Sequence, residues 1–108
     1  MRIYISIPIT GHDLEEQRAK AERFAGDIFA IGHDPINPFD CSTPPEHFDE
    51  KQKTAYYMGF DIADLLLSDA AYFSRGWEQS KGCRLEHAAA EIYGLKIFYE
   101  LDKIPEAE

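Results

Sequence analysis

The fold is decided first by residues 1–11, which read Met-Arg-Ile-Tyr-Ile-Ser-Ile-Pro-Ile-Thr-Gly. Residues 2–9 are a run of β-branched and aromatic side chains, and such a run predicts a buried strand. Pro8 and then Thr10-Gly11 predict a tight loop at its end, because proline and glycine interrupt regular structure. A strand that begins the chain and stops in a loop is typical of a domain built from alternating strands and helices.

The rest of the chain continues this alternation. Asp13 and Glu16 have the spacing of a capping box, and apolar residues then recur at helical intervals up to Gly32. Two prolines in residues 33–38 favour an edge strand, because proline donates no ladder hydrogen bond. Polar composition predicts a loop over 39–53, with a helical piece after Thr43, and a fraying acidic tail over 101–108. Apolar patterns predict the elements between them: a helix over 54–68, a strand over 70–74, a helix that ends at Tyr93 and a strand over 96–100.

This β-α-β-α-β-α-β order predicts an α/β fold, because right-handed crossovers force a parallel sheet with helices on both faces. We expect a small doubly wound, flavodoxin- or Rossmann-like three-layer sandwich over residues 1–100, with a four- to five-stranded, mainly parallel sheet. Ligands of such folds bind beyond the carboxyl ends of the strands. The segments to search are therefore 7–13, 37–41 and 74–86.

Composition excludes several classes of function. Twenty acidic residues against eleven basic ones give a net charge of −9, so a nucleic acid polymer is not expected as a partner. No apolar run has the length of a membrane span and no secretory signal is apparent, so a cytoplasmic protein is expected. Cysteines and histidines lack metal-ligand spacing, and GxGxxG and GxxxxGK[ST] motifs are absent, so we predict neither a metal nor a cofactor.

Residues 80–82, Ser80-Lys81-Gly82, lie at the predicted start of the last long helix. Free backbone N–H groups and the positive end of the helix dipole make such a position a potential anion site. Arg75 and Arg84 add nearby positive charge in an otherwise acidic chain. The alternative is that Ser80 only caps the helix and that the cations form a solvated surface.

Two acids are candidates for chemistry. Glu86 lies about one turn into the same helix, and its side chain should lean back toward the strand ends. Asp61 lies close to the apolar face of its helix, where a carboxylate must find partners or shift its pKa. Glycosyl chemistry uses such a pair, with one carboxylate as nucleophile. The alternative is a pair of surface acids in salt bridges.

The segments 3–11, 61–69 and 76–86 together resemble the nucleoside 2-deoxyribosyltransferase superfamily, which includes the deoxynucleoside 5'-monophosphate N-hydrolases. The likeness extends from residue 1 to about residue 100. It implies that Glu86 attacks C1' of the deoxyribose and that Asp61 holds the sugar and assists. It also implies that the Tyr4 hydroxyl lies near the catalytic carboxylate and that Ser80 binds a 5'-phosphate.

The resemblance adds further expected contacts and some departures. Pro8, Thr10 and Gly11 are expected to line the substrate site, although Pro8 and its neighbour replace the glycine or serine common in the superfamily. Glu78 is a candidate for base recognition. Trp77 is expected either to stack on the base or to pack against a neighbouring helix. Tyr4 has the alternative of a buried hydroxyl satisfied within the core.

These observations predict an enzyme that cleaves or transfers the N-glycosidic bond of a 2'-deoxynucleoside or its 5'-monophosphate through a covalent Glu86 intermediate. The partner is a small nucleoside or nucleotide. The alternatives are a noncatalytic nucleotide-binding protein on the same fold and a purely structural or interaction domain. The resemblance further implies a homo-oligomer, with helix 54–68 and its tyrosines as the candidate interface.

Overall fold

The computed structural model describes residues 1–108 and shows four strands joined by three helices. The strands are β1 (Arg2–Ser6), β2 (Asp34–Ile36), β3 (Ala70–Phe73) and β4 (Lys96–Phe98), the α-helices are α1 (Leu14–Ala30), α2 (Glu50–Leu66) and α3 (Lys81–Ile92), and the short 3-10 helices are η1 (Trp77–Gln79) and η2 (Leu101–Lys103).

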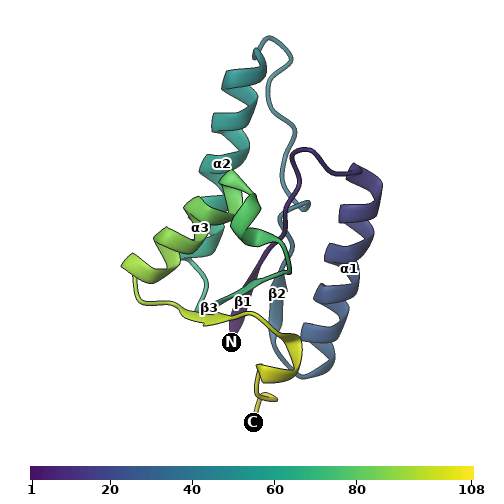
Figure 1. The fold of residues 1–108 in the computed structure, drawn as a ribbon, viewed down its shortest axis with the longest axis vertical. Helices are drawn as coiled ribbons and strands as arrows, with labels where there is room; N and C mark the ends of the chain where they lie inside the picture. The colour runs from purple at the N-terminus through teal and green to yellow at the C-terminus, as the bar shows by residue number, and fades with distance from the viewer.

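All strand pairs are parallel, and the strand order is β2-β1-β3-β4. Helix α1 covers one face of the sheet, and α2 and α3 cover the other (Figure 1). The predicted doubly wound α/β fold is confirmed. The chain leaves β1 toward β2 on one side and later returns to β3 on the other, so the strand order reverses between β1 and β3. A crevice at their carboxyl ends is where this architecture places ligands.

The alternation of β1 decides which side chains reach each face. Ile3 and Ile5 pack with Ile28 of α1, whereas Tyr4 packs with Leu65 of α2 on the opposite face. Because side chains two apart in a strand share a face, Ser6 points to the same side as Tyr4, toward α2 and α3.

Strand β1 is shorter than predicted. It ends at Ser6, whose pairing partner Phe73 is the last residue of β3. Beyond Ser6 neither neighbouring strand continues. Residues 7–9, although β-branched in part, therefore form a loop instead of extending the sheet.

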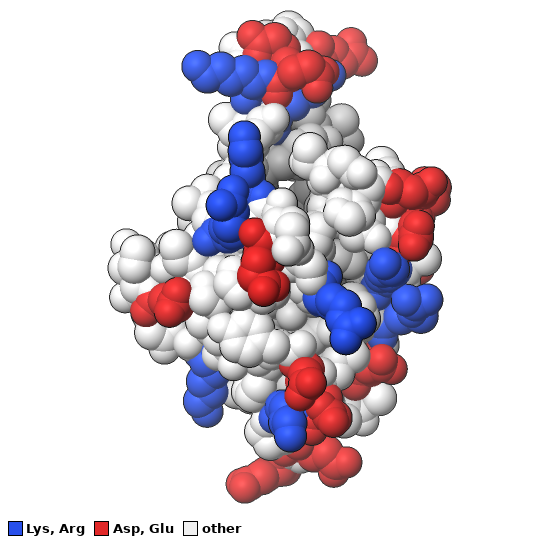
Figure 2. All heavy atoms as spheres, in the orientation of Figure 1, with Lys and Arg blue, Asp and Glu red and all other residues white.

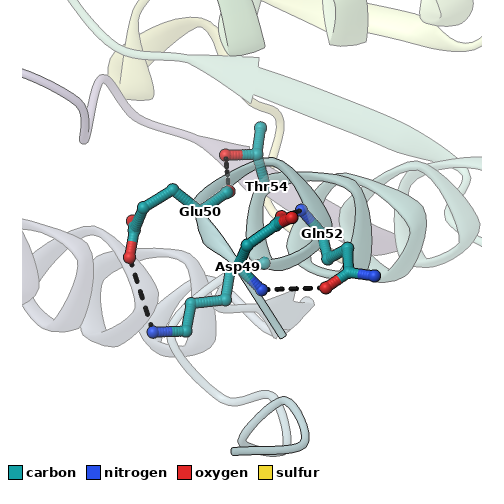
Figure 3. A network of polar contacts seen from close by, with 5 residues as sticks. Asp49, Glu50, Gln52 and Thr54 are labelled. Atoms are coloured by element: carbon teal, nitrogen blue, oxygen red, sulfur yellow. Dashed lines mark hydrogen bonds and ion pairs between the residues drawn. The ribbon is translucent and has the colours of Figure 1, made fainter. Parts of the chain in front are cut away.

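Helix α2 begins at Glu50, four residues before the predicted start. The separate helical piece predicted after Thr43 is absent, because residues 44–49 are not helical. The reason for the earlier start is a capping box (Figure 3). The backbone N–H of Asp49 donates to Gln52 Oε1 at 2.8 Å, and the backbone N–H of Gln52 donates to Asp49 Oδ1 at 2.8 Å. The Asp-x-x-Gln pattern was the sequence signal for this start.

The C-terminal segment is ordered against the body, so the expectation of fraying is wrong. Ile104 is buried in the cluster between the sheet and α1. The backbone N–H of Ala107 donates to the carbonyl of Ile31 at 2.8 Å. An apolar side chain in the acidic segment therefore anchors it. Separately, none of the helices combines the length and the apolar character that crossing a membrane requires.

Candidate active site

A cleft of about 1060 Å³ opens at the carboxyl end of β1. Its walls come from the loop after β1, the first turns of α1, the loop after β2, the inner side of α2 and the first turns of α3. The structure brings Tyr4, Asp61, Ser80 and Glu86 together in this cleft. They come from three different elements and the cap of α3, as the position of the strand-order reversal leads one to expect.

Glu86 is the most constrained of these residues. It is only 4% exposed, and both of its carboxylate oxygens accept a hydrogen bond. The Tyr4 hydroxyl donates to Oε2 at 2.7 Å, and the Ser6 hydroxyl donates to Oε1 at 2.7 Å. Burial raises the pKa of Glu86 above its usual value, and the bonds from Ser6 and Tyr4 offset part of this increase because they stabilise the charged form.

The Tyr4 phenol is held in its protonated form. Burial and the neighbouring charge of Glu86 raise the pKa of Tyr4 well above its usual value. A fully buried Tyr4 hydroxyl is therefore a hydrogen-bond donor at neutral pH. The Tyr4 hydroxyl is also buried and hydrogen-bonded within the core, as the alternative for Tyr4 stated, because its buried partner is Glu86.

Asp61 lies on α2 in a different environment. Burial, then the charge of Glu86 and then that of Asp64 raise the pKa of Asp61 to about 7. No hydrogen-bond donor offsets these effects. Neither Asp61 nor Glu86 forms a salt bridge, so the alternative of surface ion pairs is wrong. The cleft thus holds Asp61, whose pKa of about 7 leaves about half of it protonated at neutral pH, beside Glu86, whose oxygens accept from two hydroxyls.

Ser80 both caps α3 and lines the cleft. Its side chain caps the helix, accepting a hydrogen bond from the backbone N–H of Cys83 at 3.2 Å, and it also lines the cleft with Lys81 and Gly82. At Gly82 a Cβ would lie 3.1 Å from Met58 Cε, so the glycine permits the close approach of α3 to α2. Arg75 and Arg84 are not part of the cleft wall.

The loop after β1 lines the cleft through Ile7, Ile9 and Thr10, which differ in part from the expected residues. Thr10 lines the cleft, but Pro8 and Gly11 do not. Pro8 is buried, and its carbonyl accepts a hydrogen bond from the Gln17 side chain, which ties the loop to α1. Gly11 has a φ of +84°, so it serves the turn into α1.

Trp77 and Glu78 lie outside the cleft, contrary to expectation. They line a separate depression of about 750 Å³ beside β4. The Trp77 ring stacks on His87 with centroids 4.1 Å apart and contacts Phe73 at 5.6 Å. Packing against α3, the alternative considered for Trp77, is what the structure shows, because one face of the half-buried ring stacks on His87.

Sequence reasoning missed several residues of the site. Ser6 does not line the cleft but donates to Glu86 from behind it, and it could have been found from its position two residues after Tyr4 in a strand. Arg18 and Phe39 do line the cleft, and the guanidinium of Arg18 lies 4.9 Å from the centre of the Phe39 ring. Figure 2 shows Lys and Arg side chains spread over the middle of one face among large uncharged areas. The net negative charge therefore does not make the surface uniformly acidic.

Comparisons with known proteins agree with this architecture. Residues 1–99 match the family described as a domain of unknown function, DUF4406. The chain belongs to the DUF4406 family. It matches no curated protein sequence. This DUF4406 chain is similar in structure to the 2-deoxyribosyltransferase of the psychrotolerant bacterium Bacillus psychrosaccharolyticus, with a TM-score of 0.68 and 17% identity over 90% of this chain and 69% of that chain. The resemblance to the deoxyribosyltransferases is thereby confirmed for the fold.

Proposed function

We propose that the protein cleaves or transfers the N-glycosidic bond of a 2'-deoxynucleoside or of its 5'-monophosphate. The observation that carries the proposal is the buried Glu86 carboxylate, fixed at both oxygens in a cleft that also holds Asp61. A carboxylate of fixed orientation is suited to act as a nucleophile on a sugar carbon. The shared fold with a 2-deoxyribosyltransferase supports this choice of chemistry.

The proposed reaction has two steps. In the first, an oxygen of Glu86 forms a bond to C1' while the bond from C1' to the base nitrogen breaks, and the electron pair leaves with the base. The protonated Asp61 carboxyl, with a pKa of about 7, supplies a proton to the departing base. In the second step, water or another base attacks C1', the ester to Glu86 breaks, and the proton lost by the attacking group returns to Asp61.

The cleft walls support a flat, partly apolar substrate. Phe39, Tyr57 and Met58 supply aromatic and apolar surface, while Thr10 and Ser80 supply hydroxyls. Ligand sites commonly combine an apolar wall with a few polar groups that fix orientation. A nucleobase with an attached sugar has this mixture.

The start of α3 supports recognition of a 5'-phosphate. The Ser80 oxygen accepts a bond from Cys83, so its own proton remains available to a phosphate oxygen. Lys81 adds a positive charge at the same helix end, where the dipole favours an anion. We expect Ser80→Ala to weaken activity on monophosphates far more than on nucleosides, and an equal effect on both would contradict a phosphate site.

The deciding experiment measures free base released from a panel of deoxynucleosides and their monophosphates, by chromatography, with and without an acceptor base. Glu86→Gln should lower the release by at least about 10³-fold, because the nucleophile is lost. Glu91→Gln is the matched control: it is an exposed glutamate on the same helix and should keep wild-type activity. Release that survives Glu86→Gln would contradict the mechanism. Nucleotide binding without release would identify the noncatalytic alternative.

We propose in addition that the protein is a homo-oligomer that associates through α2. This helix leaves Tyr57 40% and Phe60 42% exposed. Phe60→Glu should lower the molar mass measured by light scattering to that of one chain, because a buried charge at an interface is costly. The control is Phe29→Glu, since Phe29 is more exposed and lies on α1 across the sheet. A wild-type protein of 12.3 kDa in solution would contradict the proposal.

A further inference from the structure

Ser6 is a polar residue in the fully buried part of β1, and its hydroxyl lies between Glu86 and the Cys83 thiol. It is 0% exposed, and its only proton is donated to Glu86 Oε1 at 2.7 Å across 80 positions of sequence. Its backbone is also fixed, because the carbonyl of Ser6 accepts a hydrogen bond from the N–H of Ser74 at 3.0 Å. The sheet thus fixes the Cα of Ser6, and only rotation of its side chain could carry the hydroxyl away from the carboxylate.

The charged and titratable groups that face Glu86 come from each element packed around it. They are Tyr4 on β1, Asp61 on α2 and Cys83 on α3, and the cleft wall adds Lys81, Arg18 on α1 and Cys41 after β2. Burial raises the pKa of the Cys83 thiol, so this group is neutral at physiological pH. No cation forms an ion pair with Glu86. The hydroxyls of Ser6 and Tyr4 are thus the groups that stabilise a negative charge on Glu86.

We propose that Ser6 is a positioning residue for the acid pair: together with Tyr4 it keeps Glu86 as the ionised member and leaves the proton on Asp61. The geometry is one-sided, because Glu86 has a donor on each oxygen whereas Asp61 has none. Each Glu86 oxygen keeps a second lone-pair site for a reacting carbon. The catalytic meaning rests on the proposed function, but the location of the proton is a property of the substrate-free protein.

The test is carbon-13 NMR of the Glu86 side-chain carboxyl in the substrate-free protein, titrated with pH. The signal is identified by its loss in Glu86→Gln. Ser6→Ala should move the Glu86 midpoint upward by roughly one pH unit, because the charged form loses one of two donors. Where base release is detected, the acidic limb of its pH profile should move upward by the same amount.

Two further variants keep the test decisive. Ser74→Ala is the matched control: Ser74 is also a buried serine, it directly follows β3 with its backbone N–H bonded to the carbonyl of Ser6, and its hydroxyl has no hydrogen-bond partner. It should leave the Glu86 midpoint unchanged. Ser6→Cys keeps the size of the side chain but offers a weak donor, so it should shift the midpoint in the same direction if Ser6→Ala fails to fold. A reductant is needed because Cys83 is close to Ser6.

The outcomes separate this proposal from the proposed function. A Glu86 midpoint unchanged in both Ser6 variants would overturn it, and so would an equal shift in Ser74→Ala. A shift confined to the Ser6 variants supports it even when no substrate releases a base, in which case only the glycosidic activity fails.

Discussion

At the scale of single residues, the cleft contains two acids that burial affects in the same direction but that have different partners. Glu86 accepts two short hydrogen bonds, whereas Asp61 faces the charges of Glu86 and Asp64 without a donor. The pKa of Asp61, about 7, lies above the usual 3.8. Between these two values the folded state binds more protons than the unfolded state. The free energy of unfolding therefore falls as the pH rises from about 4 to about 7.

Asp61→Asn should consequently stabilise the protein at alkaline pH. The amide carries no charge, so the variant lacks the cost of ionising a buried carboxyl, and its Tm should exceed that of the wild type at about pH 8. The advantage should disappear near pH 4, where Asp61 is protonated in the folded state. Thermal unfolding scans across this range test the prediction, with exposed Asp102→Asn as control. A Tm for Asp61→Asn below that of the wild type at about pH 8 would contradict it.

At the scale of elements, α2 depends on local contacts more than on the core. Only Leu65 among its 17 residues is buried, and its N-terminal half extends away from the sheet (Figure 1). The capping box closes its first turn, and the rings of Phe48, Tyr56 and Phe60 pack in sequence beside it. Because α2 forms one wall of the cleft, the stability of this half affects the site.

Asp49→Ala should therefore destabilise the protein by about 1 kcal/mol, since an unpaired N–H remains at the start of α2. For a domain of this size the loss corresponds to a Tm lower by roughly 4–8 °C. Glu50→Gln is the control, because the Glu50 side chain is 93% exposed and forms only a 3.5 Å ion pair with Lys53. Calorimetry distinguishes them, and equal Tm values for the two variants would show that the box is not stabilising.

At the scale of the whole molecule, the C-terminal segment completes the layer formed by α1. Ile104 joins the cluster of Ile3, Ile28 and Tyr72. The buried His33 side chain donates from Nε2 to the carbonyl of Pro105 at 2.6 Å. The segment after β4 is thus part of the core on this face.

Ile104→Ala should lower the free energy of unfolding by about 2–4 kcal/mol, because a buried aliphatic side chain is replaced by a cavity. Ile92→Ala should change it by less than about 0.5 kcal/mol, because Ile92 is 78% exposed at the end of α3. Urea unfolding measures both. Similar values for the two isoleucines would mean that the segment does not contribute to the core.

The sequence by itself determined the order of strands and helices, the parallel sheet and the candidate pair of Asp61 and Glu86. These features depend on local periodicity and on the handedness of crossovers, and both can be read along the chain. The start of α1 followed from the cap at Asp13, and the starts of β3 and β4 followed from their apolar runs, whereas the start of α2 was missed because the Asp49 box was overlooked.

Only the tertiary structure decided which side chains meet. The bond between Ser6 and Glu86 joins residues 80 positions apart, and Trp77 turned to His87 instead of the cleft. Ile104 likewise became core because the sheet and α1 left an apolar surface for it to cover. The physical reason is that burial and hydrogen bonding depend on neighbours in space, which local sequence patterns do not specify.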